Sequence, residues 1–250
     1  MKVIIIAAGE GSRMGKLTEL LPKPLITVNG LTIIEKQILS FRKNNIKNFF
    51  IITGPHSEKF DLKEITYIND SKYTSHDTLG SFMCARDYLN EEIIVTYGDQ
   101  IFDEKIIEQV KNFSGDIGIA IDLEWEKNYE GRDQHPKSEA ENVLLDNQNN
   151  ILELRKNISS CKENQKIGES LGLMRFSKKA SKKFIERYSE LNDSHSGKFH
   201  NADTFNQAII SDMLQELIDL GLKVEPIFIR GKWCEIDTPQ DLERARKIFT

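Results

Sequence analysis

The chain has 250 residues, of which 29% are charged and 39% hydrophobic, and its formal net charge is −5. This length predicts one domain, and the composition excludes general disorder. The negative net charge argues against a nucleic-acid-binding protein, because phosphate contacts need a basic surface. The N-terminal apolar run is too short to span a membrane and lacks a signal-peptide cleavage pattern. Three widely spaced cysteines fit no metal-ligand spacing and suggest a reducing, cytoplasmic setting.

The first half of the chain is predicted to alternate strands with helices. Residues 3–8 form a β-branched run that ends in glycine, which is typical of a strand buried on both faces. After a polar loop, apolar residues recur at helical spacing over residues 32–44. Further strands are predicted over residues 48–53, 65–68 and 93–97, and a helix over 78–89. This alternation predicts right-handed βαβ units and a mostly parallel sheet covered by helices, an α/β fold.

The regular alternation lapses at residues 122–141, a polar stretch that we interpret as an insertion beside the binding site. Hairpin-like segments follow around Val143 and Leu154, and a strand is predicted over residues 170–176. Helices are predicted over residues 177–191 and 202–220, the second stopped by Gly221. A strand over residues 223–229 leads to a last helix, for which Thr238 is the predicted N-cap and Pro239 the first helical residue.

The strongest chemical signal directly follows the first strand and reads AAGEGSRMG, with PKP a few residues later. Glycines in such a loop let backbone N–H groups approach phosphate oxygens. Arg13 adds a planar guanidinium for two oxygens of a polyphosphate, and Lys23, held between two prolines, adds a compact charge. The alternative is a glycine turn with surface cations. The candidate phosphate-binding residues are Ala8, Gly9, Gly11, Ser12, Arg13 and Lys23.

A glycine loop after a strand also opens dinucleotide-binding folds. Here Met14 replaces the third glycine of that pattern, and no acid about 20 residues further on lies at a strand end to bind a ribose. A nicotinamide-dependent oxidoreductase is therefore a remote alternative, which absence of NAD(H) binding would dismiss.

Two acids are candidate metal ligands. Asp99 follows the apolar strand at residues 93–97, so its carboxylate is expected at the edge of the sheet where open α/β folds bind ligands. Asp237 lies in WCEID, just ahead of the last predicted helix. Since Mg²⁺ is usually held by one or two carboxylates plus substrate phosphates, two acids from distant segments fit a Mg²⁺ site. Taken singly, Asp99 could be a turn residue and Asp237 a helix-terminus acid.

Two further segments carry candidate binding residues. In YTSHDTLGS, the residues Asp77, Gly80 and Ser81 stand at a helix entry and could read the edge of a base, or form a plain N-cap turn. In the 122–141 stretch, aromatic faces and carboxylates suit an ammonium group, and a guanidinium suits a phosphate or phosphonate. The aromatic residues could equally be core and the histidine scaffold. The candidates in that stretch are Trp125, Tyr129, Arg132, His135, Glu139 and Glu141.

Three of these segments together resemble a known family. AAGEGSRMGKLTELLPKPLITVNG, YGDQ and WCEIDTPQDLERA are similar to the sugar-nucleotidyltransferase-like fold, and the resemblance covers nearly the whole chain. The compact length and the D-x-x-W-x-x-x-Y-x-x-R block from Asp122 to Arg132, followed by EAE, look most similar to bacterial cytidylyltransferases. Those enzymes act on phosphocholine, 2-aminoethylphosphonate and other phosphorylated small molecules in surface-polymer synthesis.

The resemblance implies a single Rossmann-like three-layer domain with a mostly parallel mixed sheet. A nucleotide-binding half would span about residues 1–121, an acceptor-binding half with the insertion about 122–237, and a C-terminal helix 238–250. By this resemblance, Gly9, Gly11 and Arg13 would contact the triphosphate, and Lys23 would contact the α-phosphate. Gly80 and Ser81 would lie near the base, and Asp99 and Asp237 would bind Mg²⁺. The segment SHDTLG lacks the paired asparagines of many phosphocholine enzymes, so an acceptor with a primary amine or amino-acid character is equally open.

The implied reaction is attack by an acceptor phosphate or phosphonate oxygen on the α-phosphorus of CTP, with release of pyrophosphate. Its catalytic residues would be Lys23, Arg13, Asp99 and Asp237, with no general base. The expected partners are an NTP and a small phosphorylated acceptor, without nucleic acid or membrane, and a homodimer stays open. Two alternatives also stay open: a hexose-1-phosphate uridylyl- or thymidylyltransferase, and a non-catalytic nucleotide sensor.

Overall fold

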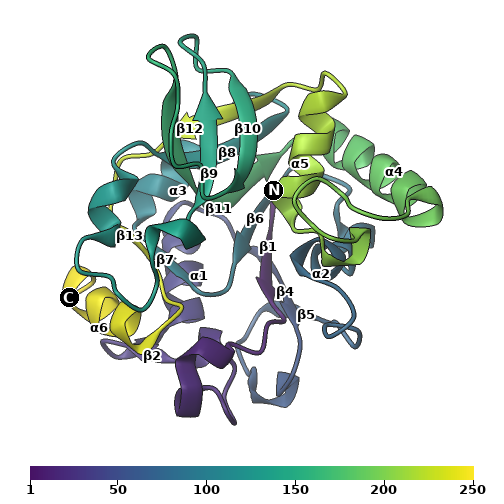
Figure 1. Ribbon diagram of the computed structural model, residues 1–250. Coiled ribbons are helices and arrows are strands. Elements are labelled where there is room, and N and C mark those ends of the chain that lie inside the picture. Colours follow the sequence, from purple (N-terminus) through teal and green to yellow (C-terminus); the bar gives the residue numbers. More distant parts are fainter.

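A mixed nine-stranded sheet forms the centre of the computed structural model, which describes residues 1–250 (Figure 1). Its first half has the order β6-β1-β4-β5, all parallel, with β1 (Lys2–Ala7), β4 (Asn48–Thr53), β5 (Ile65–Asn69) and β6 (Ile93–Tyr97). Its second half contains β8 (Ile117–Asp122), β9 (Glu141–Leu145), β10 (Ile151–Lys156), β11 (Lys166–Phe176) and β12 (Val224–Phe228). Strand β11 joins the halves, antiparallel to β6, β8 and β9.

The remaining pairings are parallel for β8 with β12 and antiparallel for β9 with β10. It follows that only β10 and β11 run against the other strands. The α/β fold with a mostly parallel mixed sheet, expected from the sequence, is therefore confirmed.

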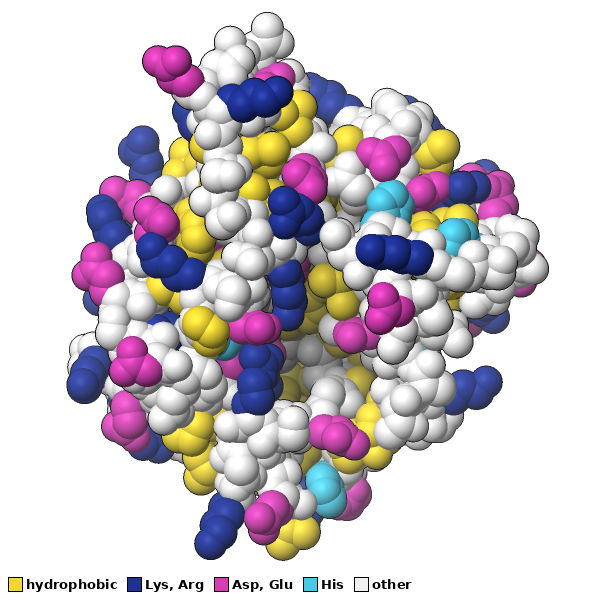
Figure 2. Space-filling model, viewed as in Figure 1, with side chains coloured by type: hydrophobic (Ala, Val, Ile, Leu, Met, Phe, Trp, Pro, Cys, Tyr) yellow, Lys and Arg dark blue, Asp and Glu magenta, His cyan; other side chains and the backbone are white.

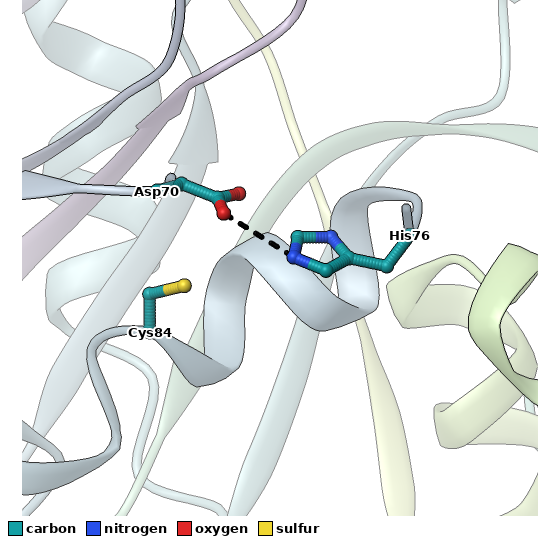
Figure 3. A group of neighbouring side chains, drawn as sticks. All are labelled: Asp70, His76 and Cys84. Carbon is teal, nitrogen blue, oxygen red and sulfur yellow. Dashed lines mark ion pairs between the residues drawn. The ribbon is translucent and has the colours of Figure 1, made fainter. Parts of the chain in front are cut away.

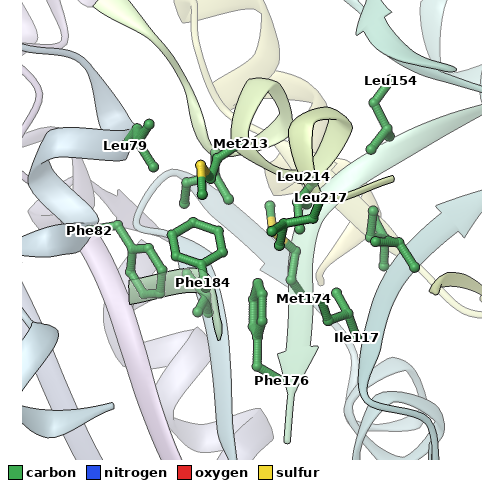
Figure 4. Close-up of a cluster of buried hydrophobic side chains, with 14 of the residues drawn as sticks. Leu79, Phe82, Ile117, Leu154, Met174, Phe176, Phe184, Met213, Leu214 and Leu217 are labelled. Atoms are coloured by element: carbon green, nitrogen blue, oxygen red, sulfur yellow. The ribbon is translucent and has the colours of Figure 1, made fainter. Parts of the chain in front are cut away.

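Helices cover both faces of the sheet because alternate side chains of its strands point to opposite sides. Ile4 and Ile6 of β1 join a core beneath α2 (Thr78–Met83), α4 (Lys178–Ser194) and α5 (Ile210–Asp219), part of which is drawn in Figure 4. Val3 and Ile5 join a second core beneath α1 (Ile33–Lys43) and α3 (Glu104–Lys111). The arrangement is thus helix layer, sheet, helix layer.

Two small antiparallel sheets stand beside this body. They pair β2 (Thr27–Val28) with β3 (Leu31–Thr32), and β7 (Gln100–Phe102) with β13 (Trp233–Glu235). Helix α6 (Pro239–Ile248) packs next to them around a third core that includes Met14 and Leu242. The pairing of β7 with β13 matters for the site, because the Ile236 N–H donates to the Asp99 carbonyl at 2.9 Å.

Seven short 3-10 helices lie in the connections. They are η1 (Ser12–Leu17), η2 (Lys23–Leu25), η3 (Ser57–Lys59), η4 (Arg86–Tyr88), η5 (Trp125–Tyr129), η6 (Lys137–Glu139) and η7 (Phe205–Gln207). The polar 122–141 stretch therefore folds as two 3-10 turns rather than as a regular helix or strand.

Two helices are shorter than the sequence predicts. The helix predicted over residues 78–89 ends at Met83. The helix predicted over residues 202–220 begins only at Ile210, because the Asp212 carboxylate accepts the backbone N–H groups of Asn201 and Ile209 and so holds the preceding segment as a loop. The predicted start of the last helix is confirmed: Thr238 is its N-cap and accepts from the Asp241 N–H.

All three cysteines are free thiols in the structure. Cys84 and Cys161 are exposed, and Cys234 is buried in the core under α6. None of the helices combines the length and the apolar character that crossing a bilayer requires.

Candidate active site

A cleft opens at the carboxyl ends of β1 and β6, where open α/β sheets bind ligands. The surface is hollowed near the middle of the face shown in Figure 2, and Lys and Arg side chains lie beside the hollow. One part of the cleft has a volume of about 230 Å³, and an adjoining part of about 80 Å³ shares Arg13, Tyr97 and Asp237 with it. The larger part is further lined by Gly9, Gly11, Ser12, Lys23, Thr78 and Asp99.

Lys23 lies at the centre of a charge cluster in the larger part. Its ammonium donates to Asp99 Oδ2 at 2.7 Å and to Asp237 Oδ1 at 2.6 Å, and Arg13 contacts Asp237 Oδ2 at 2.9 Å. Burial alone would lower the pKa of Lys23, but the two carboxylates outweigh burial and raise this pKa above its usual value. Burial likewise opposes ionisation of Asp237, yet His135, Lys23 and Arg13 hold its pKa well below the usual range. Both groups are therefore charged at neutral pH.

The glycine loop is folded tightly against Lys23. Gly11 has a φ of 65°, which L side chains rarely adopt, and a Cβ there would lie 3.1 Å from the Lys23 Cβ. The Thr18 hydroxyl donates to the Gly11 carbonyl at 2.9 Å and holds the loop in this position. Gly9 and Ser12 are exposed at the cleft, whereas Ala8 is buried beneath it. Gly11 thus needs glycine both for its backbone and for close packing.

The two acids meet the basic requirement for a divalent cation site. Asp99 and Asp237 lie on either side of the Lys23 ammonium, although they are far apart in sequence. Asp99 Oδ1 is buried and has no hydrogen-bond partner, which is energetically unfavourable. A cation bound to this oxygen would remove that cost. Carboxylate oxygens are the ligands that Mg²⁺ takes in proteins. The donor set therefore fits Mg²⁺.

The smaller part of the cleft is rich in buried carboxylates. Burial raises the pKa of Glu141 to about 6 and the pKa of Glu169 to about 8. Burial, with Asp237 and Asp99 nearby, also raises the pKa of Glu235. Glu141 Oε1 and Glu169 Oε2 are buried without a hydrogen-bond partner. This pocket consequently holds buried carboxyl oxygens that no group of the protein contacts.

Of the six residues predicted in the 122–141 region, three line the cleft and three do not. His135, Glu139 and Glu141 line its smaller part. His135 is buried, with Nδ1 at 3.2 Å from Asp237 Oδ2, and Glu139 also pairs with Lys156 at 3.1 Å.

Trp125, Tyr129 and Arg132 instead hold the insertion together. Trp125 and Tyr129 are buried against each other, and the Tyr129 hydroxyl donates to Glu169. Arg132 is only 5% exposed, lies over the Tyr129 ring and donates to Asp241 Oδ1 at 2.5 Å. Its Nη2 lies 3.6 Å from Glu235 Oε2, and Arg132 itself lines neither part of the cleft.

None of the three residues predicted to contact the base lines the cleft. Asp77 caps α2 by accepting the Thr78 N–H, and Thr78, not Asp77, lines the cleft. Gly80 packs against another side chain away from the cleft, and the Ser81 hydroxyl donates to buried Asp70 at 2.8 Å.

Several cleft residues escaped prediction from the sequence. Glu235 and Trp233 could have been predicted from the sequence, because alternate residues of a strand share a face and both lie an even number of residues before Asp237. Glu169 and Tyr97 had no such signal, since their place depends on the neighbours of β11 and β6.

The raised pKa of Glu169 predicts a pH-dependent stability. An unfolded glutamate ionises near a pKa of about 4.3, whereas folded Glu169 ionises near 8. Between these values the folded state binds more protons, so the contribution of this group to stability falls as pH rises from about 4 to about 8. Glu169→Gln should therefore match the wild type near the lower pH and exceed it in stability near the upper pH. Urea denaturation across this range would test this, with exposed Glu163→Gln as control; a constant difference would contradict it.

Comparison with known proteins agrees with this geometry. Residues 3–126, which contain the glycine loop, Lys23 and Asp99, match the MobA-like NTP transferase domain. This chain is accordingly a nucleotidyltransferase, and therefore an enzyme.

This nucleotidyltransferase is 27% identical over 256 residues to the CTP:phosphoglutamine cytidylyltransferase of Campylobacter jejuni. The alignment covers 97% of this chain and 98% of that protein. It is 26% identical over 254 residues to the bifunctional protein GlmU of Methanocaldococcus jannaschii, covering 100% of this chain but only 54% of that longer protein. The solved CTP:phosphocholine cytidylyltransferase of Streptococcus pneumoniae has the same fold, with a TM-score of 0.74 and 22% identity over 100% of this chain and 99% of that one.

Proposed function

We propose that this nucleotidyltransferase is a Mg²⁺-dependent cytidylyltransferase that transfers CMP from CTP to a small phosphorylated acceptor carrying an ammonium group, with release of pyrophosphate. The observation that carries the proposal is the Lys23 ammonium between Asp99 and Asp237, beside a glycine loop and next to a carboxylate-lined pocket. The similarity to cytidylyltransferases along nearly the full chain supports CTP as the donor.

The side chains of the larger pocket suit phosphoryl transfer without a covalent intermediate. An acceptor phosphate or phosphonate oxygen is already anionic at neutral pH, so it needs no general base to attack the α-phosphorus. Lys23 and Arg13 would then stabilise the negative charge on the transferring group, since fixed cations in a partly buried site are worth more than in water. Mg²⁺, held by Asp99 and Asp237, would supply further charge neutralisation and orientation of the phosphates when bound.

The smaller pocket favours a cationic acceptor over a sugar phosphate. A sugar offers hydroxyl groups but no charge, whereas a bound ammonium group donates up to three hydrogen bonds and lowers the raised pKa values of Glu141 and Glu169, which favours their ionised forms. Glu141 and Glu169 each have one buried oxygen without a partner there. The named acceptors of the two cytidylyltransferases above, phosphoglutamine and phosphocholine, are themselves phosphorylated and cationic at nitrogen. An amino-acid-like or aminoalkyl phosphate, or an aminoalkylphosphonate, fits this pocket best.

The test is pyrophosphate release with Mg²⁺, measured for each of four NTPs against phosphorylated amino acids, 2-aminoethylphosphonate, phosphocholine and hexose 1-phosphates. We expect release with CTP and an amine-bearing acceptor. Release only with UTP or dTTP and a hexose 1-phosphate would overturn the proposal in favour of a sugar enzyme. Binding of NTP without release for any acceptor would overturn it in favour of a nucleotide sensor.

Glu141→Gln should weaken acceptor binding selectively. Loss of one hydrogen bond to a charged group is worth about 1.5–3 kcal/mol, so the acceptor KM should rise by about 10- to 100-fold. The KM for CTP should change little, because Glu141 lines only the smaller pocket. Glu153→Gln, on the half-buried side of β10 and outside both pockets, is the matched control. Equal effects of Glu141→Gln on both KM values would contradict an acceptor-specific role.

A further inference from the structure

A second cluster of ligand-type side chains lies outside the cleft, around α2. Asp70 follows β5, His76 stands in the turn before α2, and Cys84 is the residue after it. One ligand atom from each of the three lies within 4.8 Å of the others. Figure 3 shows the three side chains converging from separate segments of the chain. The nucleotidyl-transfer chemistry proposed above uses none of them.

The hydrogen bonds of His76 leave an imbalance that a cation would resolve. Its Nδ1 lies 3.2 Å from the Asp77 carbonyl oxygen, and its Nε2 lies 3.2 Å from Asp70 Oδ1. Both partners can only accept, because one is a carbonyl and the other a carboxylate. A neutral imidazole has one donor and one acceptor nitrogen, so one of its nitrogens would face an acceptor with a lone pair. A metal ion bound at Nε2 would accept this lone pair and remove the mismatch.

The hydrogen bonds of His76 and Asp70 to neighbouring groups are of the kind that orient ligands in metal sites. A metal-bound histidine usually donates its other ring N–H to a carbonyl or carboxylate, which is the contact that Nδ1 makes with Asp77. Asp70 is 1% exposed and is oriented by the Ser81 hydroxyl at 2.8 Å and the Lys72 N–H at 3.1 Å. Outer contacts of this kind fix ligand direction before any ion binds.

Gly80 explains why the imidazole can lie where it does. A Cβ at Gly80 would be 2.4 Å from the His76 Cγ, too close for any side chain without moving the ring. The glycine that the sequence suggested for base recognition therefore makes room for His76. Beside it, an open pocket of about 450 Å³ is lined by His76, Gly80 and Cys84 and gives solvent access to the cluster.

We propose that Asp70, His76 and Cys84 form a binding site for a thiophilic divalent metal ion, Zn²⁺ being the ion whose preferences match. Zn²⁺ accepts one sulfur, one nitrogen and one oxygen ligand in tetrahedral sites, and three protein ligands leave a fourth position for water from the pocket. Mg²⁺ does not suit this donor set, because it prefers oxygen ligands alone. The site stands independently of the proposed cytidylyl transfer.

Binding requires a small rearrangement and releases a proton. Without metal, the Cys84 S–H lies 3.7 Å from the Gly80 carbonyl oxygen, which accepts it. The metal forms a bond to the sulfur, and the thiol proton leaves to solvent. Cys84 is exposed, just past the end of a short helix, so its side chain can rotate toward the other two ligands.

Cobalt substitution tests the site in the full-length chain. Chelator-treated protein is titrated with Co²⁺, and thiolate-to-cobalt absorption in the near ultraviolet is measured, followed by displacement with Zn²⁺. We expect a saturable band that Zn²⁺ removes and excess Mg²⁺ does not, and its absence in Cys84→Ser. Cobalt held by Asp99 and Asp237 would give no such band, because that site has only oxygen ligands.

Matched variants complete the test. His76→Gln should lower Zn²⁺ affinity by more than about tenfold, since loss of even an outer partner costs about 10- to 100-fold. Cys161→Ser and His56→Gln, which change a cysteine and a histidine outside the cluster, should leave both band and affinity unchanged. No thiolate band in the wild type, or a band that persists in Cys84→Ser, would overturn the proposal.

Discussion

Lys23→Ala is expected to slow turnover by about 10²- to 10³-fold, because one well-placed electrostatic group contributes about 3 to 4 kcal/mol to transition-state stabilisation. In the structure the Lys23 ammonium is largely buried and lies between Asp99 and Asp237, next to the glycine loop. Initial rates of pyrophosphate release at saturating CTP and Mg²⁺ would measure the effect. Because the variant retains both carboxylates, its dependence on Mg²⁺ should persist.

Lys16→Ala is the control for this experiment. Lys16 lies on the same N-terminal loop, is exposed and is not among the residues that line the cleft, so its removal should leave turnover nearly unchanged. If Lys23→Ala lowered the turnover rate by less than tenfold, a direct role of this ammonium in the chemical step would be ruled out. Circular dichroism of both variants would show whether the fold is retained.

Arg132→Ala is expected to destabilise the protein by about 3–5 kcal/mol, the usual cost of removing one partner from a buried ion pair. The change leaves buried Asp241 without the guanidinium that donates to it at 2.5 Å. Asp241 in turn accepts from the Thr238 and Asp237 N–H groups at the start of α6, so the loss should reach the cleft indirectly. Urea denaturation would measure the free energy of unfolding.

The outcome also decides between two roles for Arg132. Arg86→Ala, at an exposed arginine, is the control and should change stability by no more than about 0.5 kcal/mol. If Arg132→Ala were as stable as the wild type and instead raised the acceptor KM, the residue would bind the acceptor phosphate, as its sequence context suggested. A large stability loss would establish that it holds the insertion to α6.

Local patterns were enough to predict the parts of this protein that depend on neighbours in sequence. The β-branched run of β1, the glycine loop and the proline-flanked Lys23 could be recognised because each is specified within a few residues. The start of α6 was predictable for the same reason, since its capping box joins Thr238 and Asp241 within one turn. The resemblance of these segments to a nucleotidyltransferase family then indicated the fold as a whole.

The remaining features of the site depend on pairing between segments that are far apart in the sequence. Asp99 and Asp237 are brought together by the pairing of β7 with β13, and neither of these short strands was predicted. Gly80 and Arg132 have roles that depend on His76 and Asp241 in three dimensions, so their sequence context suggested ligands where the fold has internal contacts. The acid-lined pocket draws Glu141 and Glu169 from adjacent strands and Glu235 from β13. Because side chains meet across strands whose register no local pattern encodes, the composition of that pocket became visible only once the chain was folded.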